Sequence, residues 1–277
     1  MTFSEMINVN AVAYHNEKTK KMMEKSPLEK PYFVQIAANN IENAVKAVEI
    51  INETEWIDGI DINLGCPVNK ARRSGFGGVL LKDENRGFLK ETVNAIVKTS
   101  KKPVSAKMRI GFDKSVVEER AKLLEDLGIM FLTIHGRLVK QMYKGNTDYN
   151  EIKKGVKAVK IPVIANGDIT DYEKAKFVLD YTGACGVSIG RGAVGKPWIF
   201  LEMKQQGTIT PEQKKEVILE HFKQMVYWYG EYGVILFRKH AHAYSKGIQK
   251  ASEFRSKMNN VKDPDTAREL IEEYFNV

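Results

Sequence analysis

Apolar, β-branched segments recur along the first part of the chain, and a stretch with helical periodicity separates each segment from the next. The segments cover residues 2–7, 32–37, 59–64, 104–110, 131–135, 162–166 and 186–189. Strands that alternate with crossover helices predict a parallel sheet covered by helices. An α/β fold of the TIM-type (β/α)8 barrel class fits best. Because such a barrel usually has eight strands and seven are recognisable here, one strand is unaccounted for.

The pattern changes after Gly207, where helical segments follow one another without strands between them. Helices are predicted over residues 211–229, 234–251 and 264–275, with Pro211 in a first turn, where proline is favoured. We therefore predict a barrel domain over residues 1–206 and a small helical domain over 207–277. Within the barrel, Thr170-Asp171-Tyr172-Glu173 is typical of a capping box that begins a helix at Thr170.

The net charge of +8 favours a polyanionic partner such as nucleic acid, although it is also compatible with a role in solubility alone. The predicted helical domain holds 11 Lys and Arg against 10 Asp and Glu, so most of the excess charge lies in the barrel. In the helix expected over 234–251, four basic residues recur every three or four positions and would form one stripe: Lys239, His242, Lys246 and Lys250. Both an RNA-facing stripe and a solvated helix face remain open.

Two cysteines, Cys66 and Cys185, form neither a disulfide framework nor a metal-binding pair, and no long apolar run or signal-like N-terminus is present. A cytoplasmic protein without membrane association is the default expectation. His240 and His242 lie two residues apart on a predicted helix and point to different faces, so we expect no metal site there.

Polar residues cluster where the predicted strands end, which in a parallel barrel is the catalytic mouth. Cys66 follows the strand 59–64, where Pro67 interrupts the ladder. A thiol there is placed for chemistry or is simply a buried cysteine, and both interpretations stay open. The other strand-end residues are Gln35, Asn63, Lys107, Arg109, His135, Arg137 and Asn166.

Two glycine-containing turns at the last predicted strands favour phosphate binding. Asn166-Gly167-Asp168 precedes a helix, and Gly190-Arg191-Gly192 follows the strand 186–189. Barrels often hold a phosphate after their seventh and eighth strands through backbone amides. The glycines at 75, 77 and 78 match neither a P-loop nor a dinucleotide fingerprint.

Taken in order, the motifs resemble the tRNA-dihydrouridine synthase family. They are Asn63-Leu64-Gly65-Cys66-Pro67-Val68-Asn69-Lys70, Lys107-Met108-Arg109, His135-Gly136-Arg137, Asn166-Gly167-Asp168-Ile169, Gly190-Arg191-Gly192 and, near the C-terminus, Arg238-Lys239-His240 with Tyr244 and Gly247. The resemblance implies a flavin oxidoreductase in which NADPH reduces FMN, a hydride passes to C6 of a uracil in tRNA and Cys66 protonates C5.

The same resemblance implies roles for individual residues. Cofactor-binding residues would be Gln35, Lys107, Asn166, Gly167, Asp168, Gly190 and Arg191. Substrate-binding residues would be Asn63, Arg109, His135, Arg137, Lys239 and Lys246. The loop that carries Arg72 and Arg73 would close over a base flipped out of the RNA stack.

Two other functions stay open at this point. One is a flavin barrel acting on a free pyrimidine, similar to dihydroorotate or dihydropyrimidine dehydrogenase, and the other is a non-catalytic RNA-binding barrel. The chain also opens at a segment that resembles the family's second strand, so the resemblance implies that the first strand and the helix after it are missing. We therefore expect that the natural start lies upstream and that this version binds FMN weakly and is poorly active, because an open barrel edge is costly.

Overall fold

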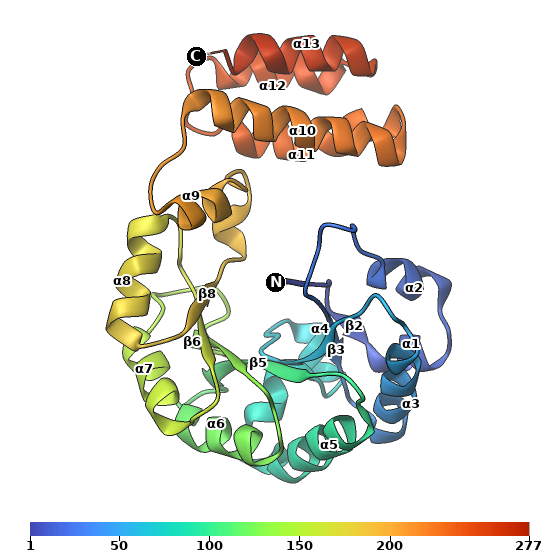
Figure 1. The fold of residues 1–277 in the computed structure, drawn as a ribbon, viewed down its shortest axis with the longest axis vertical. Coiled ribbons are helices and arrows are strands. Elements are labelled where there is room, and N and C mark those ends of the chain that lie inside the picture. Colours follow the sequence, from blue (N-terminus) through green and yellow to red (C-terminus); the bar gives the residue numbers. More distant parts are fainter. Residues whose placement is uncertain (277) are drawn as a thin grey trace. The chain divides into compact units, whose positions relative to one another are not determined.

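The structure is a computed structural model that describes residues 1–276, and it consists of two compact units (Figure 1). The sheet unit contains Met1–Gly167 and Phe177–Ser188. The helical unit contains Asp168–Lys176 and the described residues from Ile189 onward. Helix α8 (Tyr172–Thr182) contributes to both units.

The sheet unit is built on a curled parallel sheet with helices on its outer side (Figure 1). In residues 1–276 the pairing order is β1-β3-β4-β5-β6-β7-β8, and β2 also pairs with β3. Because β1 and β2 pair with the same strand, they are two pieces of one strand position, which confirms the predicted count of seven. That the natural chain starts upstream stays a prediction. The strands are β1 (Thr2–Phe3), β2 (Ile7–Asn8), β3 (Tyr32–Ala37), β4 (Gly59–Leu64), β5 (Val104–Gly111), β6 (Leu132–Leu138), β7 (Val163–Asn166) and β8 (Gly186–Ser188).

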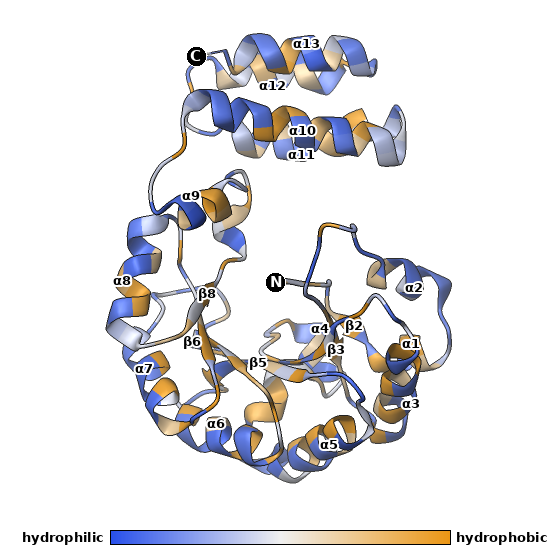
Figure 2. Cartoon of the chain, viewed as in Figure 1, coloured by the Kyte–Doolittle hydropathy of each residue, from blue (hydrophilic) through white to orange (hydrophobic). Residues whose placement is uncertain are grey.

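Amphipathic helices cover the outer side of this sheet (Figure 2). In α3, the buried residues Ala44, Ala47, Val48 and Ile51 recur at helical spacing and pack towards the strands. The helices before the helical unit are α1 (Val9–Ala13), α2 (Glu17–Met23), α3 (Ile41–Asn52), α4 (Asn69–Arg73), α5 (Arg86–Thr99), α6 (Val117–Asp126) and α7 (Tyr149–Ala158), with 3-10 helices η1 (Gly77–Leu81) and η2 (Asp83–Asn85).

Side chains alternate along β5, and this alternation brings polar residues to the inner side of the sheet. Ser105, Lys107 and Arg109 alternate with the buried Ala106 and Met108. The parallel register places Asn63 beside Lys107 and His135 beside Asn166. The sheet therefore gathers the predicted strand-end residues of its own unit on one side.

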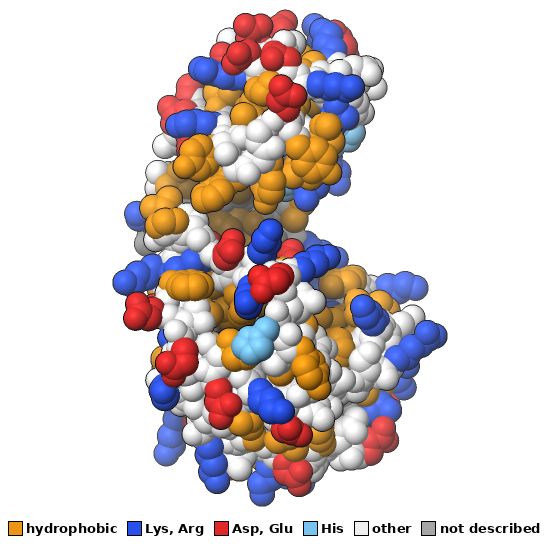
Figure 3. Space-filling view, turned by 90° about the vertical axis from the view of Figure 1, so that its right-hand side faces the viewer, with side chains coloured by type: hydrophobic (Ala, Val, Ile, Leu, Met, Phe, Trp, Pro, Cys, Tyr) orange, Lys and Arg blue, Asp and Glu red, His pale blue; other side chains and the backbone are white. Residues whose placement is uncertain are grey.

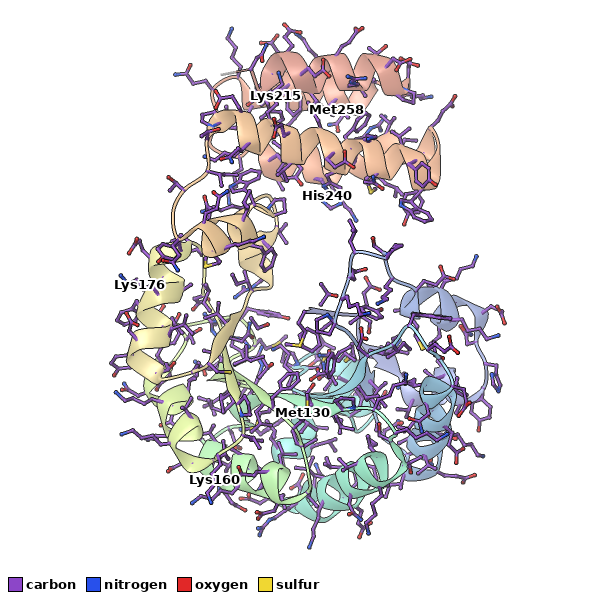
Figure 4. All side chains as sticks on the ribbon, in the orientation of Figure 1. Met130, Lys160, Lys176, Lys215, His240 and Met258 are labelled. Carbon is purple, nitrogen blue, oxygen red and sulfur yellow. The ribbon has the colours of Figure 1, made fainter. Side chains whose placement is uncertain are left out.

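The helical unit packs four helices around an apolar core that includes Phe222, Phe237 and Met258, the last labelled in Figure 4. Thr210 caps α10 with a reciprocal capping box to Gln213, and Pro211 occupies the first turn as predicted. The elements from residue 191 onward are η3 (Arg191–Ala193), α9 (Ile199–Gln205), α10 (Pro211–Tyr229), α11 (Tyr232–Tyr244), α12 (Ala251–Asn260) and α13 (Pro264–Tyr274).

Two predicted helices differ from the structure. The helix expected over 234–251 is shorter, because α11 ends at Tyr244 and Gly247 adopts a positive φ of 83° in the turn that follows. The next helix, α12, begins only at Ala251 and was not predicted. The predicted capping box at Thr170 is shifted by one residue. Asp171 accepts the hydrogen bond from Lys174 N (2.8 Å), whereas the Thr170 hydroxyl donates to the Asp171 carboxylate.

Candidate active site

Cys66 lies directly after β4, where its main chain is held from two sides. The Asn63 Oδ1 atom accepts hydrogen bonds from Gly65 N (3.1 Å) and Cys66 N (2.9 Å). From the other side, Gly78 N donates to Cys66 O, and a Cβ added to Gly77 would lie 2.9 Å from the Cys66 Cβ. The thiol is half-buried and free of any disulfide. The glycines at 77 and 78 thus allow the close approach that positions it.

A relay of side chains fixes the orientation of Asn63. The Asn63 Nδ2 donates to Gln35 Oε1 (2.7 Å), and Gln35 Nε2 donates to Asp61 Oδ2 (2.7 Å). An ionised carboxylate only accepts hydrogen bonds. Asp61 therefore forces Gln35 to present its amide nitrogen, which forces Asn63 to present its own nitrogen to Gln35. The Asn63 oxygen is left to face the main chain at Cys66.

Asp61 was not predicted as a site residue, since it lies inside the apolar strand 59–64. It is fully buried, and Ser105 Oγ donates to its second oxygen (2.7 Å). Burial raises the pKa of Asp61 to about 6, while the hydrogen bonds from Ser105 and Gln35 and the charge of Lys107 act to lower it. Its alternation with Asn63, two residues further along the same strand, was the one signal in the sequence.

Lys107 is a half-buried cation on the inner side of the sheet. Burial lowers the pKa of its ammonium group to about 8, opposed by the charge of Asp61 and assisted by that of Arg109. Its Nζ donates to Asn166 Oδ1 (3.0 Å), and Asn166 Nδ2 donates to Ser188 O (2.7 Å). Lys107 is therefore a desolvated cation whose protonation equilibrium lies close to neutral pH.

The three other strand-end residues contact the protein itself. Arg109 donates from Nε to Gly65 O (3.0 Å) and from a terminal nitrogen to Leu138 O and Met142 O. It thus braces the turn before Cys66, and its predicted substrate contact remains a prediction.

His135 and Arg137 lie side by side on β6. A terminal nitrogen of Arg137 lies 3.3 Å from His135 Nε2 and 3.1 Å from Thr147 Oγ1. Because a guanidinium has no acceptor, the imidazole Nε2 accepts this hydrogen bond. Both side chains are buried near the end of β6, which pairs with β5, the strand of Lys107, and with β7, the strand of Asn166.

The predicted phosphate-binding residues fall in both units. In the sheet unit, Asn166 contacts Lys107, and a Cβ added to Gly167 would lie 2.4 Å from Thr147 Oγ1. In the helical unit, Arg191 lies 3.6 Å from the Asp168 carboxylate, close to Gly190 at the start of η3. Gly167 and Asp168 both have positive φ, 126° and 50°.

The four basic residues that were predicted to form one stripe do not lie on a single helix, so this prediction is wrong. Lys239 and His242 lie on α11, but Lys246 lies in the turn after it and Lys250 precedes α12 in a left-handed conformation. Lys239, Lys246 and Lys250 are exposed, and His242 contacts Asn259 Oδ1 at 3.0 Å. The four basic residues therefore lie on one helix and in the turn after it, without the helical spacing that we expected.

The helical unit also holds two features that were not predicted. The ring centroids of His221 and His240 lie 4.5 Å apart, and His240 is labelled in Figure 4. The Tyr244 hydroxyl forms a hydrogen bond with His221 Nδ1. Burial lowers the pKa of His221 to about 4. At the α10–α11 turn, four aromatic side chains are more than half exposed, Tyr227, Trp228, Tyr229 and Tyr232, on a unit with several hydrophobic surface areas (Figure 3).

A dihydrouridine synthase model matches residues 1–276. The chain belongs to the dihydrouridine synthase family. It is 43% identical over its whole length to a probable tRNA-dihydrouridine synthase of Helicobacter pylori, covering 84% of that protein. It is 39% identical to tRNA-dihydrouridine synthase B of Pasteurella multocida, with 100% of this chain and 86% of that protein covered. The family resemblance inferred from the motifs is thus confirmed, as is the expectation of an enzyme.

The fold of this dihydrouridine synthase family member is similar to a solved structure of a DHODH from Eimeria tenella in complex with ferulenol. The TM-score is 0.50 at 15% identity, with 71% of this chain and 62% of that chain covered. In residues 1–276, no helix combines the length and apolar character needed to cross a membrane, and no group of three or more metal-binding side chains comes together.

Proposed function

We propose that this protein reduces specific uridines of tRNA to 5,6-dihydrouridine, using FMN as cofactor and NADPH as reductant. The observation that carries the proposal is the held cysteine. A half-buried thiol follows β4, its main chain is bound by Asn63, and the half-buried Lys107 lies on the neighbouring strand. Family membership supports the same reaction, since relatives of this chain carry the name tRNA-dihydrouridine synthase.

The residues on the inner side of the sheet suit a flavin. A flavin ring needs both hydrogen-bond donors and acceptors, and Gln35 and Lys107 offer amide and ammonium groups there. Asn166, Gly167, Asp168, Gly190 and Arg191 would hold the ribityl phosphate. Bound FMN would supply the hydride that C6 of the uracil receives.

The protein itself would contribute a proton donor and a positive charge to the reaction. Cys66 Sγ would donate a proton to C5 of the base while C6 gains the hydride, so that the C5–C6 double bond becomes saturated. Lys107 would stabilise negative charge at the flavin edge, and a cation that is already desolvated is effective at that task. Asn63, His135 and Arg137 would hold the uracil, with Arg109 positioning the turn that carries Cys66.

The matched test is replacement of each cysteine in turn. Enzyme with FMN and NADPH is incubated with an unmodified tRNA transcript, and dihydrouridine is measured by mass spectrometry. Cys66→Ala should lower the rate by about 10²–10⁴-fold, as loss of a general acid does. The exposed Cys185, whose thiol donates to Val163 O, provides the control, and Cys185→Ala should behave as wild type. A near-normal rate for Cys66→Ala would refute the role of the thiol.

The same preparation distinguishes the two other functions. Turnover of free uracil or dihydroorotate without any effect on tRNA would indicate an enzyme of free pyrimidines. Protein that stays colourless after incubation with FMN would indicate a non-catalytic RNA-binding barrel. A visible flavin spectrum together with new dihydrouridine supports the proposal.

A further inference from the structure

A positively charged pocket of about 510 Å³ lies in the sheet unit, formed by segments that follow β4, β5 and β6. Four of its lining side chains are cations and one is a carboxylate. The cations are Arg72, Arg73, Lys82 and Lys140, and the carboxylate is Asp113. Its remaining lining residues are Asn69, Val79 and Phe112. This volume lies in the range of small-ligand sites.

Phe112 holds three of the cations close together. Lys82 Nζ lies 5.0 Å, Arg72 Cζ 5.8 Å and Lys140 Nζ 6.0 Å from the centroid of its ring. The ring face attracts cations and partly offsets their mutual repulsion. Because Phe112 is almost fully buried, these side chains cover it, and the ring is not available for a base to stack on.

The positive charge is only partly neutralised within the protein. Lys140 pairs with Asp113 (3.1 Å) and Lys82 with Glu84 (2.8 Å). Neither Arg72 nor Arg73 has a carboxylate partner within residues 1–276, and the side chain of Arg72 makes one long hydrogen bond there, to Asn69 Oδ1 (3.5 Å). Two guanidinium groups are therefore left to bind an anion, and guanidinium is well suited to phosphate.

The pocket adjoins the turn that carries the thiol. The segment Gly77-Gly78-Val79 contacts Cys66 through its glycines and lines the pocket through Val79. An anion bound in the pocket would thus be separated from Cys66 by this segment alone. Among the lining side chains only Asn69 and the paired Asp113 can accept a hydrogen bond, so the pocket offers mainly donors, which match the acceptor oxygens of a phosphate.

We propose that this pocket binds backbone phosphates of the RNA next to the target uridine, and this inference rests on the proposed function. Cations that come from three successive loops match a chain of phosphodiesters better than a single phosphate. Their contribution to binding is independent of base sequence, and its role is to fix the register of the RNA relative to Cys66.

The test is tRNA binding by the flavin-loaded enzyme, measured by fluorescence anisotropy with an unmodified transcript from 50 to 300 mM KCl. The variant is Arg72→Gln/Arg73→Gln. The control, Lys122→Gln/Lys157→Gln, removes the same charge from exposed positions on α6 and α7. Two lost contacts to single-stranded RNA should reduce the salt slope by about 1.4 and, at 0.1 M salt, weaken binding about 25-fold. The control should change neither quantity by a comparable amount.

Two results would overturn the inference. One is equal tRNA affinity for the pocket variant and the control. The other is a raised KM for NADPH with unchanged tRNA binding, which would assign the pocket to the phosphates of the dinucleotide. Lys82→Gln/Lys140→Gln repeats the test with the other two cations if α4 is perturbed. Binding is measured without turnover, so the binding comparison tests the pocket independently of catalysis. Absence of dihydrouridine with the wild-type enzyme would contradict the proposed function, and the binding comparison would still decide whether the pocket binds RNA.

Discussion

Replacement of Asp61 by Asn is expected to change how the free energy of unfolding depends on pH. Burial raises the pKa of this carboxyl from 3.8 to about 6. The folded state therefore holds the proton more tightly than the unfolded chain does. The resulting stabilisation is complete below pH 3.8 and is lost as the pH rises through about 6. At about 1.4 kcal/mol per pKa unit, this amounts to about 3 kcal/mol.

Asparagine does not ionise, so the variant lacks this loss. The amide nitrogen of the asparagine is also a hydrogen-bond donor, and it would face another donor, either the amide of Gln35 or the hydroxyl of Ser105. Two donors that face each other lower the stability by the same amount at every pH. The difference in unfolding free energy between Asp61→Asn and wild type should therefore shift by about 2.4 kcal/mol in favour of the variant between pH 4 and pH 7.

Urea unfolding at several pH values, followed by circular dichroism, measures this difference. Asp58→Asn is a control of opposite sign, because the hydrogen bond from Tyr32 N lowers the pKa of Asp58. That carboxylate stabilises the fold above its ordinary pKa, and its stabilisation is lost as the pH falls. A difference for Asp61→Asn that stays constant from pH 4 to pH 7 would show that the buried carboxyl ionises normally and would refute the reasoning.

Two further outcomes are expected. Lys107→Met should be more stable than wild type at pH 7, and the difference in stability should shrink as the pH rises from about 8 towards 10.5, because the pKa of Lys107 is lowered in the folded state. Melting temperatures of both proteins across this pH range measure the difference. A difference that does not depend on pH would contradict the desolvation of Lys107. Charge reversal at Lys239, Lys246 and Lys250 should weaken tRNA binding and flatten its salt dependence; an unchanged salt slope in anisotropy titrations would show that these exposed lysines form only a solvated surface.

The strand positions and the identity of most candidate site residues could be predicted from the sequence. The runs over 32–37 and 59–64 coincide with β3 and β4, because a strand buried on both faces is a continuous apolar segment. The residues after such runs lie at the mouth of a parallel barrel, so Cys66 and Lys107 could be placed by position alone. The linked order of the motifs then identified the family.

Pairing between distant residues could not be predicted in the same way. Asp61 lies inside an apolar run, and its role depends on Gln35 and Ser105, which come from neighbouring strands in a register that only the folded sheet defines. Arg109 likewise has the position of a ligand-binding residue, yet it binds the carbonyl oxygens of Gly65, Leu138 and Met142. A single sequence does not indicate which polar group a side chain will meet.

The sequence by itself determined the local features of this protein, namely the alternation of strands and helices, the glycine turns and the held cysteine. These depend on hydrophobic periodicity and main-chain sterics, which act over a few residues. The tertiary structure alone decided which residues share an environment. It ended α11 at Tyr244, brought His221 to His240 and gathered the cations around Phe112. Desolvation and charge act through space, so a pKa of about 6 at Asp61 arises only when the folded sheet buries this carboxyl.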